Sequence, residues 1–285
     1  MDYRQIVWLS SYPKSGNTWV RCFLDAYFLR EVNINELLSS IADTAAHWYA
    51  VGDGSEIQDL PIEIQHLARP MAMLRLVRQY MDTNKQIPLF VKTHTPNMQV
   101  NGIEGITEML TKSVIHIVRD PRDILPSFSK HMGVDLDTGL EWMQEKYRTL
   151  SPNDRSVADF IGAWDAHIRS FLNDDCHKVM WIRYEDMLED PVLSFTRILE
   201  HAGVDPDKER VKVAVEIAQL SRMQKQEKEN GFNESSPKAK NEFFGKGGSE
   251  SRDKLTPKHL HTIEKAFGST MKRLGYNRER VAYVH

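Results

Sequence analysis

The chain has 285 residues, of which 41% are hydrophobic and 27% charged, and its formal net charge at pH 7 is -3. These values are typical of a globular protein with a sizeable core, and they exclude the strongly basic field of a non-specific nucleic-acid binder. Two cysteines, Cys22 and Cys176, are too few for a disulfide framework or a four-cysteine zinc site. No apolar run approaches the roughly 18–20 residues of a membrane span. Since the N-terminus also lacks a signal-peptide pattern, we expect a cytoplasmic protein without nucleic-acid or membrane partners.

Short apolar runs predict buried strands at residues 6–9, 89–91, 114–118 and 179–182. Apolar residues at helical spacing follow the first run, between Trp19 and Phe28, and a longer helical pattern from Phe160 to Phe171 precedes the last. Strands that alternate with helices predict an α/β fold whose central, mostly parallel sheet is flanked by helices. Ligands of such sheets bind at the carboxyl ends of the strands, which is therefore where we look for the chemistry.

Helix starts are marked by Asp120-Pro121 and Asp190-Pro191, because aspartate is a good N-cap and proline suits the first helical position. Thr256, Pro257 and Gly275 similarly bound a closing helix. The polar, charged stretch 224–242 predicts a mobile surface segment. Because no repeat and no clear linker interrupts the chain, residues 1–285 are expected to form a single domain.

The turn Ser-Tyr-Pro-Lys-Ser-Gly-Asn-Thr-Trp leads from the first strand into the first helix. Such a turn presents unpaired backbone N–H groups and the positive end of the helix dipole, which together favour an anion. Gly16 permits close backbone approach, Ser15 and Thr18 add hydroxyl donors, and Lys14 adds a positive charge. An ordinary capped turn with a solvated lysine is the alternative. A nucleotide-kinase P-loop does not fit, because here the lysine precedes the single glycine.

Residues Ser11 to Trp19 resemble the 5′-phosphosulfate loop of the sulfotransferases, whose pattern is Tyr-Pro-Lys-Ser-Gly-(Thr/Asn)-Thr-Trp. The later stretch Val-Arg-Asp-Pro-Arg-Asp-Ile-Leu-Pro-Ser-Phe resembles the second signature of this family, with Arg119 and Ser127 eight residues apart. Arginine can bind phosphate with two parallel hydrogen bonds. The alternative is that Arg119 only pairs with a neighbouring carboxylate, Asp120 or Asp123.

The resemblance extends from Trp8 to Tyr276 and implies a P-loop-like nucleotide-binding architecture, with 3′-phosphoadenosine 5′-phosphosulfate as the donor. It implies that Arg119 and Ser127 hold the 3′-phosphate and that Trp19 and Tyr184 flank the adenine. The closing segment of the family, which covers the 3′-phosphate, is one residue shorter here and keeps only Lys246 and Gly247. The 5′ end of the donor would be held by Lys14, Ser15, Gly16, Asn17 and Thr18.

The Val-Lys-Thr-His stretch after the second predicted strand matches the place where the family keeps its general base, which implies this role for His94. Histidine titrates near neutral pH and can take a proton from an acceptor hydroxyl. Lys92 lies on the same face of the extended chain and would neutralise charge on the sulfuryl group, while Lys14 stabilises the leaving phosphate. A strand-end histidine with a structural hydrogen bond is the alternative for His94. The histidine and cysteine spacings predict no metal site.

The favoured function is sulfuryl transfer from the nucleotide to a hydroxyl of a small molecule or natural product. Residues 31–86 and 132–153 are expected on the acceptor side, and residues 224–255 as a mobile lid and 3′-phosphate segment. Two other functions stay open from the sequence. One is a magnesium-dependent phosphotransferase with Asp120 as a metal ligand. The other is a nucleotide-binding module without turnover.

Overall fold

The computed structural model describes residues 2–37, 61–83, 86–150, 158–235, 243–245 and 252–276. The strands are β1 (Ile6–Ser11), β2 (Leu89–Thr93), β3 (Gln99–Val100), β4 (Ile103–Glu104), β5 (Thr111–Val118), β6 (Thr149–Leu150), β7 (Asp159–Phe160) and β8 (Val179–Arg183). The α-helices are α1 (Asn17–Leu29), α3 (Ile62–Met81), α4 (Pro121–Met132), α5 (Leu136–Gln144), α6 (Trp164–Leu172), α7 (Tyr184–Glu189), α8 (Pro191–His201), α9 (Lys208–Ile217), α10 (Leu220–Asn230) and α11 (Pro257–Arg273), and a 3-10 turn covers Arg252–Lys254.

The four predicted strands form one parallel sheet in the order β2-β1-β5-β8. Every residue of β1 is buried, as its uninterrupted apolar sequence predicts. The register pairs Ser10 of β1 with Thr93 of β2 and with His116 of β5, so the carboxyl ends of the strands meet at one edge. The predicted mostly parallel α/β sheet is therefore confirmed.

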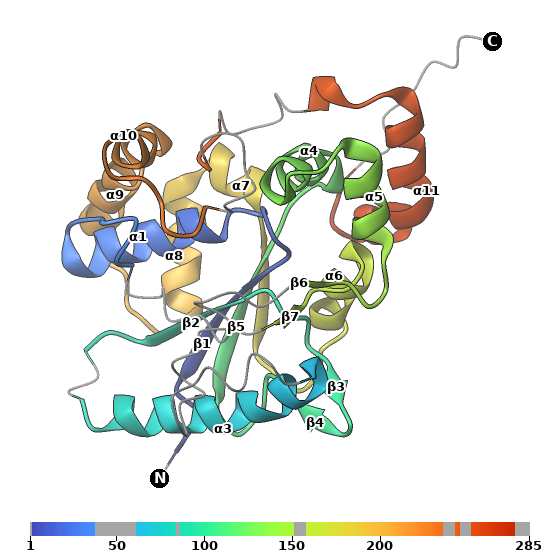
Figure 1. The fold of residues 1–285 in the computed structure, drawn as a ribbon. Coiled ribbons are helices and arrows are strands. Elements are labelled where there is room, and N and C mark those ends of the chain that lie inside the picture. Colours follow the sequence, from blue (N-terminus) through green and yellow to red (C-terminus); the bar gives the residue numbers. More distant parts are fainter. Residues whose placement is uncertain are drawn as a thin grey trace.

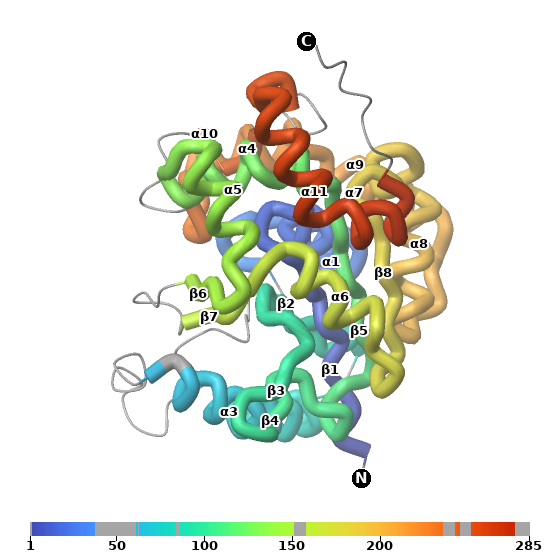
Figure 2. The backbone as a smooth tube through the Cα atoms, turned by 90° about the vertical axis from the view of Figure 1, so that its right-hand side faces the viewer, coloured from blue at the N-terminus to red at the C-terminus, as the bar shows by residue number. Residues whose placement is uncertain are grey.

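Helices cover both faces of the sheet. Val7 and Leu9 of β1 pack into a core formed with α1, α8 and α9. Ile6 and Trp8 point to the opposite face and pack against α3, which crosses the amino-terminal half of the sheet (Figure 1, Figure 2). A third cluster lies nearer the carboxyl edge and joins the sheet to α4, α5, α6 and α11.

The predicted helix caps are present. The Asp120 side chain accepts a hydrogen bond from the backbone N–H of Arg122 and caps α4, with Pro121 in the first turn. Thr256 caps α11 in a capping box, and Gly275 follows that helix with a φ of 80°. None of the helices in the described ranges combines the length and the apolar character that crossing a bilayer requires.

Two expectations differ from the structure. The helical pattern predicted from Phe160 onward begins instead at Trp164, because Asp159–Phe160 pairs with β6 as strand β7 and Gly162 adopts a left-handed φ of 60°. The stretch predicted as a mobile surface segment from residue 224 starts as the second half of α10. There, the buried carboxylate of Glu227 accepts hydrogen bonds from the backbone N–H groups of Phe243 and Phe244. Residues 236–242 lie outside the described residues.

Candidate active site

The turn after β1 forms an anion cradle. Lys14 and Gly16 have positive φ angles of 70° and 103°, which fold the chain tightly before α1 begins at Asn17. The Asn17 side chain donates to the carbonyl of Leu9 at 2.8 Å and to Ser11 Oγ at 3.2 Å, so this residue braces the turn. The start of α1 therefore lies at the carboxyl edge of the sheet, where the unpaired N–H groups of a helix N-terminus can bind an anion.

Gly16 is constrained by space as well as by its backbone angle. A Cβ atom at this position would lie 2.5 Å from Cδ2 of Tyr184, closer than a carbon atom can approach. Tyr184 begins α7 directly after β8, so this contact joins the ends of β1 and β8. Glycine is thus required where the backbone passes the tyrosine ring.

Two polar groups of the cradle are suited to a ligand. Within the ranges that the structure describes, Ser15 Oγ and Trp19 Nε1 are buried without a hydrogen-bond partner. Buried donors are almost always paired in native proteins, so each such atom calls for an explanation. A phosphate or a nucleotide base bound at this turn would supply the missing acceptors. The observed residues therefore fit the co-substrate that the sequence predicts. Thr18 is also buried, on the first turn of α1.

The ammonium group of Lys14 lies 3.4 Å from the centroid of the Phe243 ring. Burial, together with the nearby positive charge of Arg119, lowers the pKa of Lys14 to about 7. Within the described ranges, no carboxylate forms an ion pair with it. Lys14 is therefore a half-buried amine whose charged form is disfavoured despite the more distant Glu227 carboxylate, and an anionic ligand would stabilise that charged form.

His94 lies directly after β2, beside the end of β1. Its Nδ1 atom is 2.8 Å from the carbonyl oxygen of Ser11, which can only accept a hydrogen bond. Nδ1 must therefore carry the proton, which leaves the lone pair on Nε2. Burial and the positive charge of Lys92 lower the pKa of His94 well below its usual value, so the ring is neutral at pH 7. A neutral imidazole with a free Nε2 lone pair is the form that a general base requires.

The backbone around His94 is held by buried polar side chains. His167 of α6 lies with Nε2 3.0 Å from the carbonyl oxygen of His94 and donates to it. Thr95, the next residue, donates to Asp159, which forms a buried ion pair with Arg69 of α3 at 3.0 Å. These contacts fix the strand end that carries the predicted base.

Arg119 follows β5 and reaches the cradle from the other side of β1. Its Nη1 atom donates to the carbonyl oxygen of Lys14 at 3.1 Å, and its guanidinium lies 4.3 Å from the centroid of the Tyr184 ring. Tyr184 in turn contacts the ring of Trp19, with centroids 5.9 Å apart. Arg119, Trp19 and Tyr184 are thus one connected group beside the turn.

The acidic residues after Arg119 are engaged by other arginines. Asp120 forms an ion pair with Arg122 at 2.6 Å, and Asp123 forms one with Arg252 at 2.6 Å. Arg252 also contacts Asp120 at 3.2 Å, so its charge is largely compensated by these two carboxylates. Both aspartates are buried.

The remaining predicted residues are placed as follows. Lys92 is the fourth residue of β2, with its side chain 16% exposed. Ser127 is half-buried on α4, whose first turn follows Arg119. Lys246 and Gly247 lie outside the described residues.

Two further residues reach this edge of the sheet: Phe243, which the sequence places among the candidates for the acceptor pocket, and Glu234, which sequence reasoning did not assign. Phe243 covers Lys14, and Glu234 forms an ion pair with Lys92 at 2.9 Å. Both follow α10 in a stretch of mixed polar residues, where no periodicity or motif distinguishes a buried glutamate from a solvated one. Their roles depend on long-range contacts that a local pattern does not contain.

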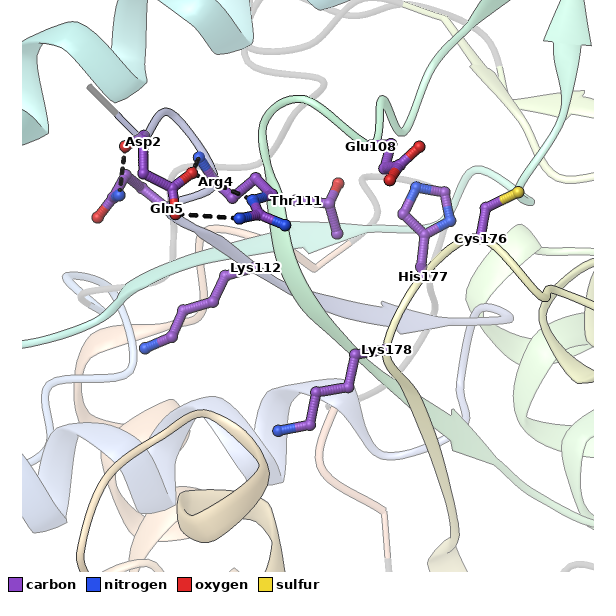
Figure 3. A pocket seen from close by; sticks show the side chains of 9 residues that line it. All are labelled: Asp2, Arg4, Gln5, Glu108, Thr111, Lys112, Cys176, His177 and Lys178. Carbon is purple, nitrogen blue, oxygen red and sulfur yellow. Dashed lines mark hydrogen bonds and ion pairs between the residues drawn. The ribbon is translucent and has the colours of Figure 1, made fainter.

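A hollow of about 550 Å³ lies near the opposite edge of the sheet, among residues that precede β1, β5 and β8 (Figure 3). Two of its cations have partners close by. Arg4 pairs with Asp2 at 3.1 Å, and Lys178 donates to the carbonyl of His201 at the end of α8 at 3.4 Å. Within the described ranges, no group of histidine, cysteine and acidic side chains is arranged to hold a metal ion.

A parallel α/β sheet with a cation-rich anion cradle at its carboxyl edge, beside a neutral histidine, defines a class of proteins that bind phosphorylated nucleotides. The chain belongs to the Sulfotransferase domain family, whose model matches residues 4–275. Curated relatives include bovine sulfotransferase 1A1, 25% identical over an alignment of 228 residues, which covers 76% of this chain and 65% of that protein. Another is cytosolic sulfotransferase 13 of Arabidopsis thaliana, 26% identical over an alignment of 273 residues, which covers 90% of this chain and 74% of that protein. The chain thus spans 64–65% of the length of the mammalian relatives.

Solved structures share this fold. Retinol dehydratase in complex with androsterone and the inactive cofactor PAP has a TM-score of 0.61 at 18% identity, with 98% of this chain and 83% of that chain covered. Mouse sulfotransferase SULT7A1 complexed with PAP has a TM-score of 0.58 at 18% identity, with 95% and 86% covered. At this level of identity, the comparison supports the fold and not the chemistry.

Proposed function

We propose that the protein transfers a sulfuryl group from 3′-phosphoadenosine 5′-phosphosulfate to a hydroxyl of a small molecule. The observation that carries this proposal is the juxtaposition of the cation cradle after β1 and the neutral, Nδ1-protonated His94 after β2. Family membership supports the donor, because adenosine 3′,5′-bisphosphate, the product that remains after transfer, occupies solved structures of the same fold.

In this proposal, the two ends of the nucleotide are bound by different strand ends. Lys14, Ser15 and Gly16, with the N-terminus of α1 through Asn17 and Thr18, hold the 5′ end. Arg119 and Ser127 hold the 3′-phosphate, and Trp19 and Tyr184 contact the adenine. Lys246 and Gly247 are proposed to complete the 3′-phosphate site.

The residues near His94 then account for the transfer. The acceptor oxygen forms a bond to sulfur as the bond between sulfur and the phosphate oxygen breaks, and the hydroxyl proton passes to His94 Nε2. Lys92 stabilises charge on the sulfuryl oxygens, and Lys14 stabilises the phosphate that is released. The mechanism assigns no role to a metal ion.

We propose a hydroxylated small molecule as the acceptor, in keeping with the androsterone and retinol bound in structures of the same fold. Residues 31–86 and 132–153 would form its side of the site. A magnesium-dependent phosphotransferase is less consistent with the structure, because the Asp120 carboxylate caps α4 and is paired with two arginines.

The experiment is His94→Ala, with the exposed His261→Ala on α11 as the matched control. Removal of a positioned base should lower turnover by about 10²–10⁴-fold. Calorimetry should show that the variant still binds adenosine 3′,5′-bisphosphate, since the cradle lies on other strand ends. Turnover of His94→Ala equal to that of His261→Ala would refute the assignment of the base. Nucleotide binding without turnover in the wild type would favour a binding module.

A further inference from the structure

A buried ion-pair network links the chain after α10 to the centre of the predicted site. Glu234 Oε2 accepts hydrogen bonds from Lys92 Nζ at 2.9 Å and from Arg21 Nη1 at 3.0 Å. Its other carboxylate oxygen lies 2.7 Å from Arg21 Nη2. One carboxylate therefore connects β2, the strand that leads to His94, with α1, the helix that begins at the anion cradle.

The network is not a surface salt bridge. The Arg21 side chain is fully buried, and those of Lys92 and Glu234 are 16% and 29% exposed. Although burial alone would raise the pKa of Glu234, the charges of Lys92 and Arg21 outweigh it and lower that pKa, so the carboxylate is ionised. Removing one partner of such a pair leaves a charge that is largely shielded from water and uncompensated, so the charges of the network depend on one another.

The backbone that carries Glu234 is itself held in place. The N–H of Asn233 donates to Asn35 Oδ1 at 2.7 Å, and Asn35 Nδ2 donates to the carbonyl of Gly231 at 3.2 Å. Phe232 is buried and contacts the ring of Phe243, with centroids 4.7 Å apart. These contacts hold the backbone of Glu234 and thereby its carboxylate. Lys92 has a long, flexible side chain, so the carboxylate determines where the Lys92 ammonium group lies.

We propose that Glu234 is a positioning residue, which holds the Lys92 ammonium at the reacting centre and ties it to the helix of the anion cradle through Arg21. The inference rests on the proposed function, in which Lys92 stabilises the sulfuryl oxygens. Glu234 does not contact the reacting atoms in this account; it acts through Lys92. Without it, the lysine would lose its anchor, and a misplacement of about 1 Å in a catalytic group costs on the order of 10²-fold in rate.

Glu234 also contributes to the electrostatics of the base. The pKa of His94 is lowered by burial, by Lys92 on its own strand and by His167 on α6, while the Ser11 carbonyl and the Glu234 carboxylate raise it. Neutralising Glu234 should therefore lower the pKa of His94 further. This change in the pKa of His94 can be measured without measuring turnover.

The test compares Glu234→Gln with Glu234→Asp in the full chain, and Glu229→Gln on the exposed side of α10 is the matched control. We expect kcat of Glu234→Gln to fall by about 10–100-fold. The dissociation constant for adenosine 3′,5′-bisphosphate should be unchanged or lower, because the site loses a negative charge. Glu234→Asp keeps the negative charge and should recover part of kcat. If Glu234→Gln does not fold, Glu234→Asp is the variant that is compared with the wild type. A kcat equal to that of Glu229→Gln would overturn the proposal.

A double-mutant cycle tests whether Glu234 acts through Lys92. If it does, adding Glu234→Gln to Lys92→Met should change kcat by less than about twofold, because the partner is already absent. Losses that multiply in the double variant would overturn the proposal.

Titration of the His94 ring by NMR gives a readout that a purely structural role would not move. In Glu234→Gln, its pKa should be lower than in the wild type; an unchanged pKa would overturn the inference. If the wild type shows no turnover, only the proposed function is refuted. The inference about Glu234 is still tested, because the titration measures whether Glu234 controls the charge at His94.

Discussion

The pKa of about 7 for Lys14 predicts that nucleotide binding takes up a proton. Burial and nearby cations disfavour the charged ammonium in the free protein, whereas a bound phosphate favours it and returns the pKa toward its usual value near 10. A group whose pKa rises on binding strengthens binding fully below its pKa in the free protein, and this contribution is lost progressively as the pH rises from that value to the higher pKa in the complex.

The expected magnitude follows from that value. At pH 8, roughly 90% of the free protein carries neutral Lys14, so binding should take up about 0.9 proton, against about 0.1 at pH 6. The Lys14 contribution should therefore raise the dissociation constant of adenosine 3′,5′-bisphosphate about tenfold between pH 6 and pH 8 relative to Lys14→Arg, which corresponds to about 1.4 kcal/mol.

Calorimetry in pairs of buffers with different ionisation enthalpies measures this proton uptake directly. The matched control is Lys14→Arg, because arginine stays charged throughout this range and leaves only the titration of the phosphates themselves. Equal proton uptake by Lys14→Arg and the wild type at pH 8 would show that Lys14 is not the titrating group, and the account of the cradle would be wrong.

Four further outcomes are expected. Gly16→Ala should lower the free energy of unfolding by about 1–3 kcal/mol in denaturant melts, because its left-handed backbone strains any other residue; an unchanged melt would contradict this. Arg119→Met should weaken binding of adenosine 3′,5′-bisphosphate more than that of adenosine 5′-phosphate; equal losses would argue against its place at the 3′-phosphate. Arg69→Met should cost about 3–5 kcal/mol of stability, because it leaves Asp159 buried and unpaired, and a melt like that of the wild type would show that the pair is not needed. Activity should persist below pH 6.5, since the pKa of His94 is lowered; a pH–rate profile that falls near pH 6.5 would contradict this.

Much of the fold could be predicted because its elements are encoded locally. The fully buried β1, the caps at Asp120 and Thr256 and the turn at Gly16 each depend on residues within a few positions of one another. Parallel packing then brings the ends of β1, β2, β5 and β8 together, so motifs more than 100 residues apart in the sequence share one edge.

The parts that could not be predicted depend on contacts between distant residues. Glu234 lies 142 residues from Lys92, and nothing in the sequence around either residue marks the pair. Phe160 fits a helical pattern, but pairing with β6 and the left-handed Gly162 place it in a strand. The charged composition after residue 224 indicates exposure, yet Glu227 is buried because two backbone N–H groups satisfy its carboxylate.

The central claim is that one nucleotide spans both phosphate sites and leaves its 5′ end beside His94. A crystal structure with adenosine 3′,5′-bisphosphate tests it most directly. The account predicts the 5′-phosphate at the N-terminus of α1 with Lys14, the 3′-phosphate on Arg119, and His94 Nε2 facing the 5′ end. A nucleotide that contacts only one of the two sites, or that lies with its 3′-phosphate at Lys14, would contradict it.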